Sequence, residues 1–300
     1  MRKILIVGPG AIGSIIAYLF MESGNSVKIF HYSNERTEKL KNKGLTLLLP
    51  QSEKVNIRPQ VATISNKGEF FDAIVYTTKS YQLETALKLT LDKFGATYYL
   101  FLQNGLKHVE IVSRCKENRE KIFFGITTLG GFRIDENTVQ VASITGETVV
   151  APFKESTPLP DVFDVPWIKY NPDYRSILWS KALINAAINP LTAILEVRNG
   201  ALEKPGHWRI VKNTIQEILK VVHALNIRLT MENPEDYVLD VVRKTSLNKS
   251  SMLQDIEKGK KTENDFITGY ILEIARKLGI EMPVNEALYN LVRIKEGEDL

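Results

Sequence analysis

The chain has 300 residues, a length that suits two domains better than a single hydrophobic core. Its 39 basic and 35 acidic residues are interspersed, which argues against the basic stripe of a nucleic-acid-binding surface. A single cysteine, Cys115, excludes an intrachain disulfide, and no run of about 18 apolar residues predicts a membrane span, so we expect a cytoplasmic globular protein with neither nucleic acid nor membrane as partner.

The first 30 residues predict a β-α-β unit. Residues 3–7, "KILIV", form a short apolar run that ends in glycine, as in a strand buried on both faces of a parallel sheet. An apolar helix is expected at 14–24 and a second strand at 26–30. The opening is therefore strand, glycine turn, helix and strand.

This alternation continues to about residue 153. We expect a strand at 71–78, a helix at 81–94, a strand at 97–105, and short β-type runs, partly antiparallel, at 121–134, 138–144 and 147–153. Strands that alternate with helices predict an α/β N-terminal domain of the Rossmann type, with a doubly wound sheet.

The character of the chain changes after a proline-rich stretch at 152–172. Helical spacing then dominates, at 175–195, 206–225, 234–247, 262–279 and 283–297. We expect a dinucleotide-binding domain at 1–170 and an all-α substrate and catalytic domain at 171–300.

The glycine turn carries the first chemical signal. Gly8, Gly10 and Gly13 form G-x-G-x-x-G between a predicted strand and a predicted helix. In such a turn the first glycine allows a tight turn, the second lets the backbone approach a pyrophosphate, and the third lets helix and strand pack closely. The residues expected to bind the cofactor here are Gly8, Pro9, Gly10, Ala11, Ile12 and Gly13.

The end of the second strand indicates which dinucleotide binds. An NAD site usually has Asp or Glu there, for the ribose 2′-hydroxyl. This chain has Tyr32 and Ser33 instead, with Arg36 nearby, and these residues present no carboxylate to repel a 2′-phosphate. The charge argument favours NADPH, with NADH as the less favoured alternative.

Polar residues also follow two later strands. Lys79 and Gln82 lie in "TTKSYQ", and Asn104 lies in "QNG". Because ligands of a doubly wound sheet lie outside the carboxyl ends of its strands, we expect these side chains near the glycine turn.

The helix at 175–195 carries an unusual polar line. Lys181, Asn185 and Asn189 recur every four residues on one face, among apolar neighbours. Buried polar groups need partners, so the line indicates either an internal hydrogen-bond network or a wet cleft with a polar ligand. Hydroxyl and carboxylate residues at 248–266, among them Glu263, offer a complement that suits binding and reduction of a keto acid.

These motifs make the chain similar to the ketopantoate reductase family (2-dehydropantoate 2-reductase), nearly end to end. The resemblance is carried by "GPGAIG", "TTKSYQ", "QNGL", "WSKALINAAINPLTAI", "NKSSMLQDIEKGKKTENDFITGYI" and "LGIEMPVNEALYNLVRIKE". It implies a Rossmann domain followed by a helical domain, with the active site in the cleft between them and no metal.

The resemblance also implies roles for individual residues. Lys181 would be the general acid and Glu263 its acidic partner, and a nearby Glu263 would oppose the lowering of the Lys181 pKa by burial. The residues implied to bind substrate or order the cleft are Asn104, Asn185, Asn189, Asn199, Asn248 and Ser251. Lys79, Gln82 and Asn104 would lie beside the cofactor.

Two departures from the family pattern keep alternatives open. Members usually carry Arg at the position of Tyr32, and residues 139–150 lack the expected His- and Gly-rich pattern. The expected activity is NADPH-dependent reduction of 2-dehydropantoate in pantothenate and coenzyme A biosynthesis. The alternatives are a paralogous reductase of another branched 2-oxo acid and a non-catalytic NADP(H) sensor; a homodimer also stays open.

Overall fold

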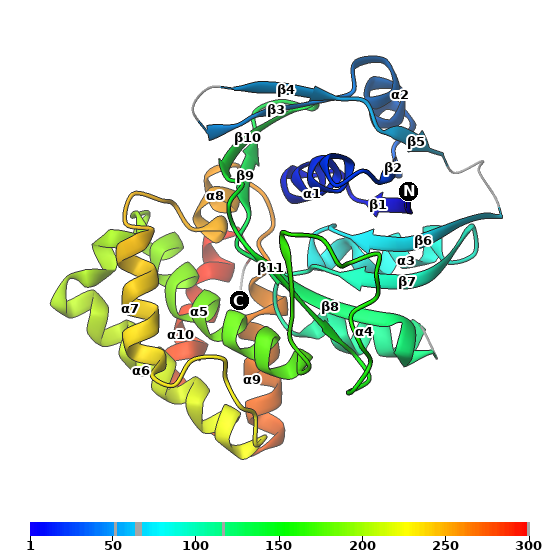
Figure 1. The fold of residues 1–300 in the computed structure, drawn as a ribbon. Helices are drawn as coiled ribbons and strands as arrows, with labels where there is room; N and C mark the ends of the chain where they lie inside the picture. The colour runs from blue at the N-terminus through cyan, green and yellow to red at the C-terminus, as the bar shows by residue number, and fades with distance from the viewer. Residues whose placement is uncertain (51–52, 64–67, 116–117, 299–300) are drawn as a thin grey trace. The chain divides into compact units, whose positions relative to one another are not determined.

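The computed structural model describes residues 1–50, 53–63, 68–115 and 118–298, and the chain divides into two compact units (Figure 1). The first unit comprises residues 1–103 and 111–174, and the second comprises residues 104–110 and 175–300. A single boundary after residue 170 was expected from the sequence. The structure adds a short segment, 104–110, to the helical unit, and this segment brings one of the predicted site residues with it.

A sheet of eight strands, in the order β12-β11-β8-β7-β6-β1-β2-β5, forms the frame of the first unit. The strands are β1 (Lys3–Val7), β2 (Ser26–Phe30), β5 (Gln60–Ala62), β6 (Glu69–Tyr76), β7 (Phe94–Phe101), β8 (Ile122–Thr127), β11 (Thr148–Pro152) and β12 (Ile168–Tyr170). From β5 to β8 all neighbours pair in parallel, and β11 runs antiparallel to β8. This is the strand order of a doubly wound nucleotide-binding sheet, with its reversal between β1 and β6. The predicted fold class is confirmed.

A second sheet, in the order β4-β3-β10-β9, completes the first unit. Its strands are β3 (Leu45–Leu48), β4 (Lys54–Ile57), β9 (Gly130–Arg133) and β10 (Thr138–Ser143). Helix α1 (Ala11–Glu22) lies between the two sheets, and Ile15 and Phe20 share one hydrophobic core with Leu47 and Val141 (Figure 1). Strands β3 and β4 were not predicted from the sequence, whereas the runs expected at 138–144 and 147–153 correspond to β10 and β11. In the structure β10 and β11 belong to different sheets, and β10 forms its hairpin with β9.

Short helices connect the strands of the first unit. They are α2 (Asn34–Lys43), α3 (Leu83–Thr90), α4 (Lys107–Cys115), and the 3-10 turns η2 (Ser80–Gln82) and η3 (Arg119–Lys121). Helix α2 shows why such a helix forms: the Ser33 hydroxyl accepts a hydrogen bond from the Arg36 N–H at its start, and Gly44 ends it with a φ of 68°.

The second unit is helical apart from its connections. Its elements are α5 (Tyr174–Leu195), η4 (Asn199–Glu203), α6 (Pro205–Ala224), α7 (Pro234–Lys244), α8 (Ser251–Glu257), η5 (Asn264–Phe266), α9 (Thr268–Lys277) and α10 (Pro283–Lys295). Helix α5 is long and apolar enough to cross a membrane, but 78% of its most apolar window is buried. It is a core helix of this unit.

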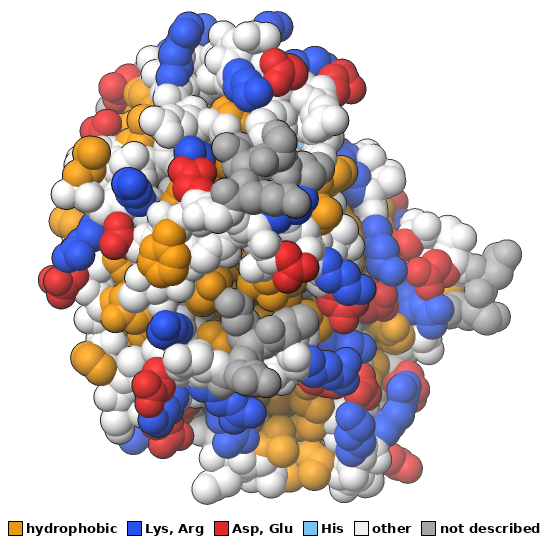
Figure 2. All heavy atoms as spheres, turned by 90° about the vertical axis from the view of Figure 1, so that its right-hand side faces the viewer, with side chains coloured by type: hydrophobic (Ala, Val, Ile, Leu, Met, Phe, Trp, Pro, Cys, Tyr) orange, Lys and Arg blue, Asp and Glu red, His pale blue; other side chains and the backbone are white. Residues whose placement is uncertain are grey.

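The distribution of charged side chains on the surface agrees with the balanced composition. On the face shown in Figure 2, Lys and Arg side chains alternate with Asp and Glu side chains. This face therefore presents no extended patch of one sign.

Candidate active site

The three glycines that follow β1 differ in how closely neighbouring atoms approach them. A Cβ on Gly8, whose φ is +95°, would lie 2.6 Å from the Thr78 side chain, and a Cβ on Gly13 would lie 2.4 Å from the Gly8 oxygen and from Thr77 Oγ1. Both glycines are required by the packing of the protein itself. A Cβ on Gly10 would meet only the Gly8 oxygen, at 4.0 Å. The protein leaves open space at Gly10, where a pyrophosphate needs close backbone approach.

The N-terminus of α1 is also suited to an anion. Gly10 is its N-cap, no side chain caps it, and its first turn contains no acidic residue. The Thr77 hydroxyl donates to the Gly8 carbonyl oxygen at 2.8 Å and so holds the turn in place. Uncapped N–H groups and the positive end of the helix dipole form the usual phosphate site, so the loop residues fit the dinucleotide expected from sequence.

The predicted cofactor residues at the end of β2 differ in exposure and in their contacts. The Tyr32 side chain is 58% exposed, and its ring stacks on His31 with 4.6 Å between centroids. Arg36 is buried, and its Nη1 donates to Asn137 Oδ1 at 2.8 Å. The nearest carboxylate in sequence, Glu35, pairs with Lys39 at 2.6 Å. Arg36 is therefore already engaged by the β9–β10 hairpin.

Two of the predicted cofactor residues, Lys79 and Gln82, follow β6. Lys79 is half-buried just before η2, and Gln82 lies exposed on η2. Gln103, which the sequence analysis passed over in favour of Asn104, is buried and donates to the backbone oxygens of Tyr76 and Thr78 at 3.0 and 3.2 Å. It ties the end of β7 to the end of β6. Its position beside Asn104 in "QNG" was the available signal.

The polar line on α5 lies in the second unit. Lys181 and Asn185 are half-buried and Asn189 is buried, between apolar residues that pack inward. Within the part of the chain that the structure describes, no hydrogen bond or ion pair engages any of the three side chains. Burial lowers the pKa of Lys181 below its ordinary value. The internal network that the sequence left open is not formed by these groups.

Asn104 and Glu263 meet although 159 residues separate them. Asn104 Nδ2 donates to Oε2 of the buried Glu263 at 2.9 Å. The segment is held there by Leu106, whose N–H donates to the Phe266 carbonyl oxygen at 3.0 Å. Gly105 is required at this point, because its φ is +84° and a Cβ would lie 2.1 Å from the same oxygen.

The relation between Lys181 and Glu263 differs from the expectation. Among the described residues Lys181 has no carboxylate within ion-pair distance, and burial is the only cause that lowers its pKa. The expected opposing effect of Glu263 on the Lys181 pKa is therefore wrong. Glu263 is held by Asn104 instead.

His108 is a buried group that the sequence analysis missed. Its side chain is fully buried close to Glu263, and burial lowers its pKa to about 4. The negative charge of Glu263 and a hydrogen bond with the Gly105 backbone act in the opposite direction, but burial outweighs them. Nothing in "GLKHVE" distinguished this histidine from one on the surface.

The remaining predicted substrate residues lie around the start of α8. The Asn199 N–H donates to the Asn248 carbonyl oxygen at 3.0 Å, and Asn199 Nδ2 donates to Thr245 Oγ1 at 2.8 Å. Asn248 and Ser251 are exposed. Ser250, in contrast, is buried, caps α8 and accepts a hydrogen bond from Thr192 at 2.7 Å.

Comparison with known proteins matches both units. Residues 4–155 match the family Ketopantoate reductase PanE/ApbA, and residues 173–296 match Ketopantoate reductase PanE/ApbA C terminal. A 2-dehydropantoate 2-reductase of Vibrio cholerae is 33% identical over 302 residues, with 98% of each chain covered.

Two solved structures are similar along almost the whole chain. PanE from Bacillus subtilis is 29% identical, with a TM-score of 0.83 over 98% of this chain and 100% of the other. D-mandelate dehydrogenase with NADH and anilino(oxo)acetate is 25% identical, with a TM-score of 0.87 and 98% of each chain covered. The chain belongs to the ketopantoate reductase family, a family of oxidoreductases that use a nicotinamide dinucleotide.

Proposed function

We propose that this protein is a cytoplasmic enzyme that reduces 2-dehydropantoate to pantoate with NADPH, a step toward pantothenate and coenzyme A. The observation that carries the proposal is the line of Lys181, Asn185 and Asn189, three polar side chains on one helix face without partners among the described residues. Asn189 is buried, and a buried polar group without a protein partner calls for a polar ligand. The relative from Vibrio cholerae, named for this reaction, matches almost the entire chain.

Lys181 is the proton donor in this proposal. When bound, NADPH supplies a hydride to the keto carbon, and negative charge then develops on the keto oxygen. The Lys181 ammonium stabilises that charge and gives its proton to the oxygen, which leaves a 2-hydroxy acid, and it regains a proton from solvent. Burial suits the group to this role, because it brings the pKa of Lys181 down toward the working pH.

Neutral donors and one carboxylate bind the rest of the substrate. Asn185 and Asn189 supply amide donors for the substrate carboxylate. Glu263, oriented by Asn104, accepts a hydrogen bond from the hydroxyl group that 2-dehydropantoate carries on C4. This pairing would select 2-dehydropantoate over 2-oxo acids that lack a hydroxyl at that position.

The role of Lys181 predicts the behaviour of one variant. Lys181→Ala should lower kcat for 2-dehydropantoate by about 10²- to 10⁴-fold, the usual contribution of a positioned general acid, and should leave the Kd for NADPH within about twofold. In the unaltered enzyme kcat should fall as pH rises through the lowered pKa of Lys181, because the ammonium is then lost. Steady-state kinetics and fluorescence titration with NADPH measure these quantities.

A matched control separates this role from a general loss of charge. Lys220→Ala removes an exposed lysine of α6 in the same unit and should change neither quantity. An unchanged kcat in Lys181→Ala would end the proposed role of that residue.

A second candidate is NADH-dependent reduction of another 2-oxo acid. The exposed Tyr32, where the family usually has Arg, and the similarity to D-mandelate dehydrogenase with NADH favour it. Purified protein should be assayed with 2-dehydropantoate and with phenylglyoxylate, each with NADPH and NADH. Oxidation of NADPH only with 2-dehydropantoate supports the first candidate. Turnover of phenylglyoxylate alone supports the second, and nucleotide binding without any turnover supports a sensor.

A further inference from the structure

Three basic side chains converge near the carboxyl end of β2, and they come from two segments about 100 residues apart. His31 and Arg36 belong to the turn and first helix after β2, and Arg133 ends β9. The charges of Arg36 and Arg133 both act on His31, and Arg133 acts on Arg36. The cluster therefore includes a cation from the hairpin that sequence proximity alone would not suggest.

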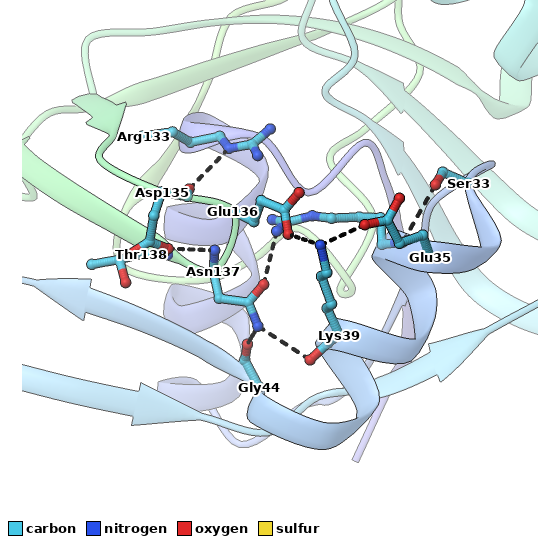
Figure 3. Close-up of polar contacts among 10 residues, drawn as sticks. Ser33, Glu35, Lys39, Gly44, Arg133, Asp135, Glu136, Asn137 and Thr138 are labelled. Atoms are coloured by element: carbon cyan, nitrogen blue, oxygen red, sulfur yellow. Dashed lines mark hydrogen bonds and ion pairs between the residues drawn. The ribbon is translucent and has the colours of Figure 1, made fainter.

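The local carboxylates are engaged elsewhere. Glu35 and Glu136 both pair with Lys39, each at 2.6 Å, and Asp135 Oδ1 accepts from the N–H groups of Asn137 and Thr138 (Figure 3). In the described part of the chain no carboxylate forms an ion pair with Arg36 or Arg133. Neither arginine therefore has an ion-pair partner of its own, although Glu136 and Asp135 still attract Arg36 through space.

The pKa of Arg36 also reflects its burial and its positive neighbour. Burial and the repulsion of Arg133 lower the pKa of Arg36 to about 10, against the attraction of Glu136 and Asp135. Burial and the charge of Arg36 likewise lower the pKa of His31. Burial is the largest cause of both shifts, and the repulsion between the positive groups, which a bound anion would relieve, adds to it.

Asn137 holds the hairpin and α2 together. Its Oδ1 accepts from Arg36, and its Nδ2 donates to the carbonyl oxygens of Lys39 and Gly44 at 3.1 and 2.9 Å (Figure 3). All three atoms that the Asn137 side chain contacts belong to α2 or its end. The bonds therefore fix the position of the β9–β10 turn against α2, and with it the base from which Arg133 extends.

The strand geometry directs Arg133 toward the nucleotide-binding side. Gly131 and Arg133 lie on the same face of β9, because side chains alternate along a strand. A Cβ on Gly131 would lie 3.0 Å from Ile15 of α1, and Arg133 pairs with the buried Val139. Arg133 itself is exposed, and Figure 3 shows its side chain extending from the hairpin in the direction of α2, whose N-cap is Ser33.

We infer that Arg133 binds the 2′-phosphate of NADP(H) and takes the place of the arginine that is missing at Tyr32. Ser33 and His31 offer further polar contacts, and Arg36, bonded to Asn137, positions the hairpin. A planar guanidinium matches a phosphate with two parallel hydrogen bonds, which suits an exposed arginine to this task. The inference rests on the proposed use of NADPH and assigns its specificity to a residue of the hairpin.

The test measures binding and not turnover. We would titrate Arg133→Gln and Arg133→Lys with NADPH, NADH and adenosine 2′-monophosphate, by fluorescence or calorimetry in the absence of any 2-oxo acid. Arg133→Gln should raise the Kd for NADPH and for adenosine 2′-monophosphate by about ten- to a hundred-fold, the range for one lost charge-assisted hydrogen bond. It should leave the Kd for NADH within about twofold. Arg133→Lys should lose less affinity for NADPH, because a lysine keeps the positive charge although it lacks the planar guanidinium.

Arg58→Gln is the matched control. It removes an exposed arginine from the same unit, at the opposite end of α2, where its side chain approaches Gly44. It should leave all three affinities unchanged. Because Arg133 is exposed, its substitution should also leave the melting temperature within about 1 °C.

Each other result counts against the inference. The inference is overturned if Arg133→Gln loses equal affinity for NADPH and NADH, or loses none. It is also overturned if the unaltered protein binds the two nucleotides with equal affinity. A protein that reduces 2-dehydropantoate with NADPH and keeps its preference in Arg133→Gln retains the proposed function and loses only this assignment. A protein without 2-dehydropantoate turnover but with the predicted binding losses retains this assignment and loses the function.

Discussion

Gly10 and Gly13 are three residues apart in one turn, yet their substitution should have different consequences. Gly10→Ala places a methyl group in open space, whereas Gly13→Ala places one 2.4 Å from a carbonyl oxygen and a hydroxyl. The first should weaken NADPH binding about tenfold or more and cost less than about 1 kcal/mol of stability, through the poorer N-cap. The second should cost about 1–3 kcal/mol of stability through overpacking. Nucleotide titration and thermal unfolding distinguish them; equal destabilisation by both would contradict this account.

His108 predicts how stability depends on pH. Its folded-state pKa is about 4 and its ordinary value is 6.5, so between these values the unfolded chain binds a proton that the folded chain does not. Stability should therefore fall as pH falls from 6.5 to 4, by about 3 kcal/mol in all for this group. Above pH 6.5 both states are neutral and the group contributes no pH dependence. His108→Asn, measured by urea unfolding at pH 7 and 5, should show a smaller loss between the two values than the unaltered protein.

At the scale of elements, α10 depends on a cap from another helix. Its own N-cap residue, Met282, has no capping side chain. The buried Glu217 of α6 accepts instead from the N–H groups of Val284 and Asn285, both at 3.0 Å, and from Asn285 Nδ2 at 2.8 Å. A carboxylate at a helix N-terminus is stabilised by these donors and by the helix dipole.

Removing this cap should be costly. Glu217→Ala removes the acceptor of three donors, two of them on the buried Asn285, and should lower the free energy of unfolding by about 2–4 kcal/mol. Lys220→Ala, one turn later on the exposed face of α6, should change it by less than about 0.5 kcal/mol. Urea unfolding followed by far-UV circular dichroism gives both values. If the two variants were equally stable, the cap would not hold α10.

At the scale of the whole molecule, nucleotide binding should be linked to unfolding. The glycine turn lies in the first unit, which has its own hydrophobic core. NADPH at about 100 times its Kd should stabilise the unit that binds it by about 2.7 kcal/mol. Calorimetry should show the transition of this unit move to higher temperature in the unaltered protein and move by about half as much or less in Gly10→Ala at the same concentration. The same upward shift in both proteins would place the nucleotide elsewhere.

The sequence predicted much of the fold where the signal is local. The apolar run of β1, the spacing of three glycines and the periodicity of α1 all lie within 22 residues, so the β-α-β unit could be recognised directly. The helices of the second unit were recognised for the same reason. The four-stranded sheet was not, because β3 pairs with β10 about 90 residues later and neither short strand shows that pairing by itself.

The sequence by itself determined the family, the order of the two kinds of domain, the glycine turn and the polar line of α5, because each is written in the spacing of neighbouring residues. Only the tertiary structure decided which distant groups meet. It placed Asn104 on Glu263, bonded Arg36 to Asn137, fixed the hairpin that carries Arg133 against α2, and left Lys181 without an ion pair. These contacts join residues from about 100 to 160 positions apart. They depend on how strands and helices pack, and packing follows from the burial of many residues at once and not from any single motif.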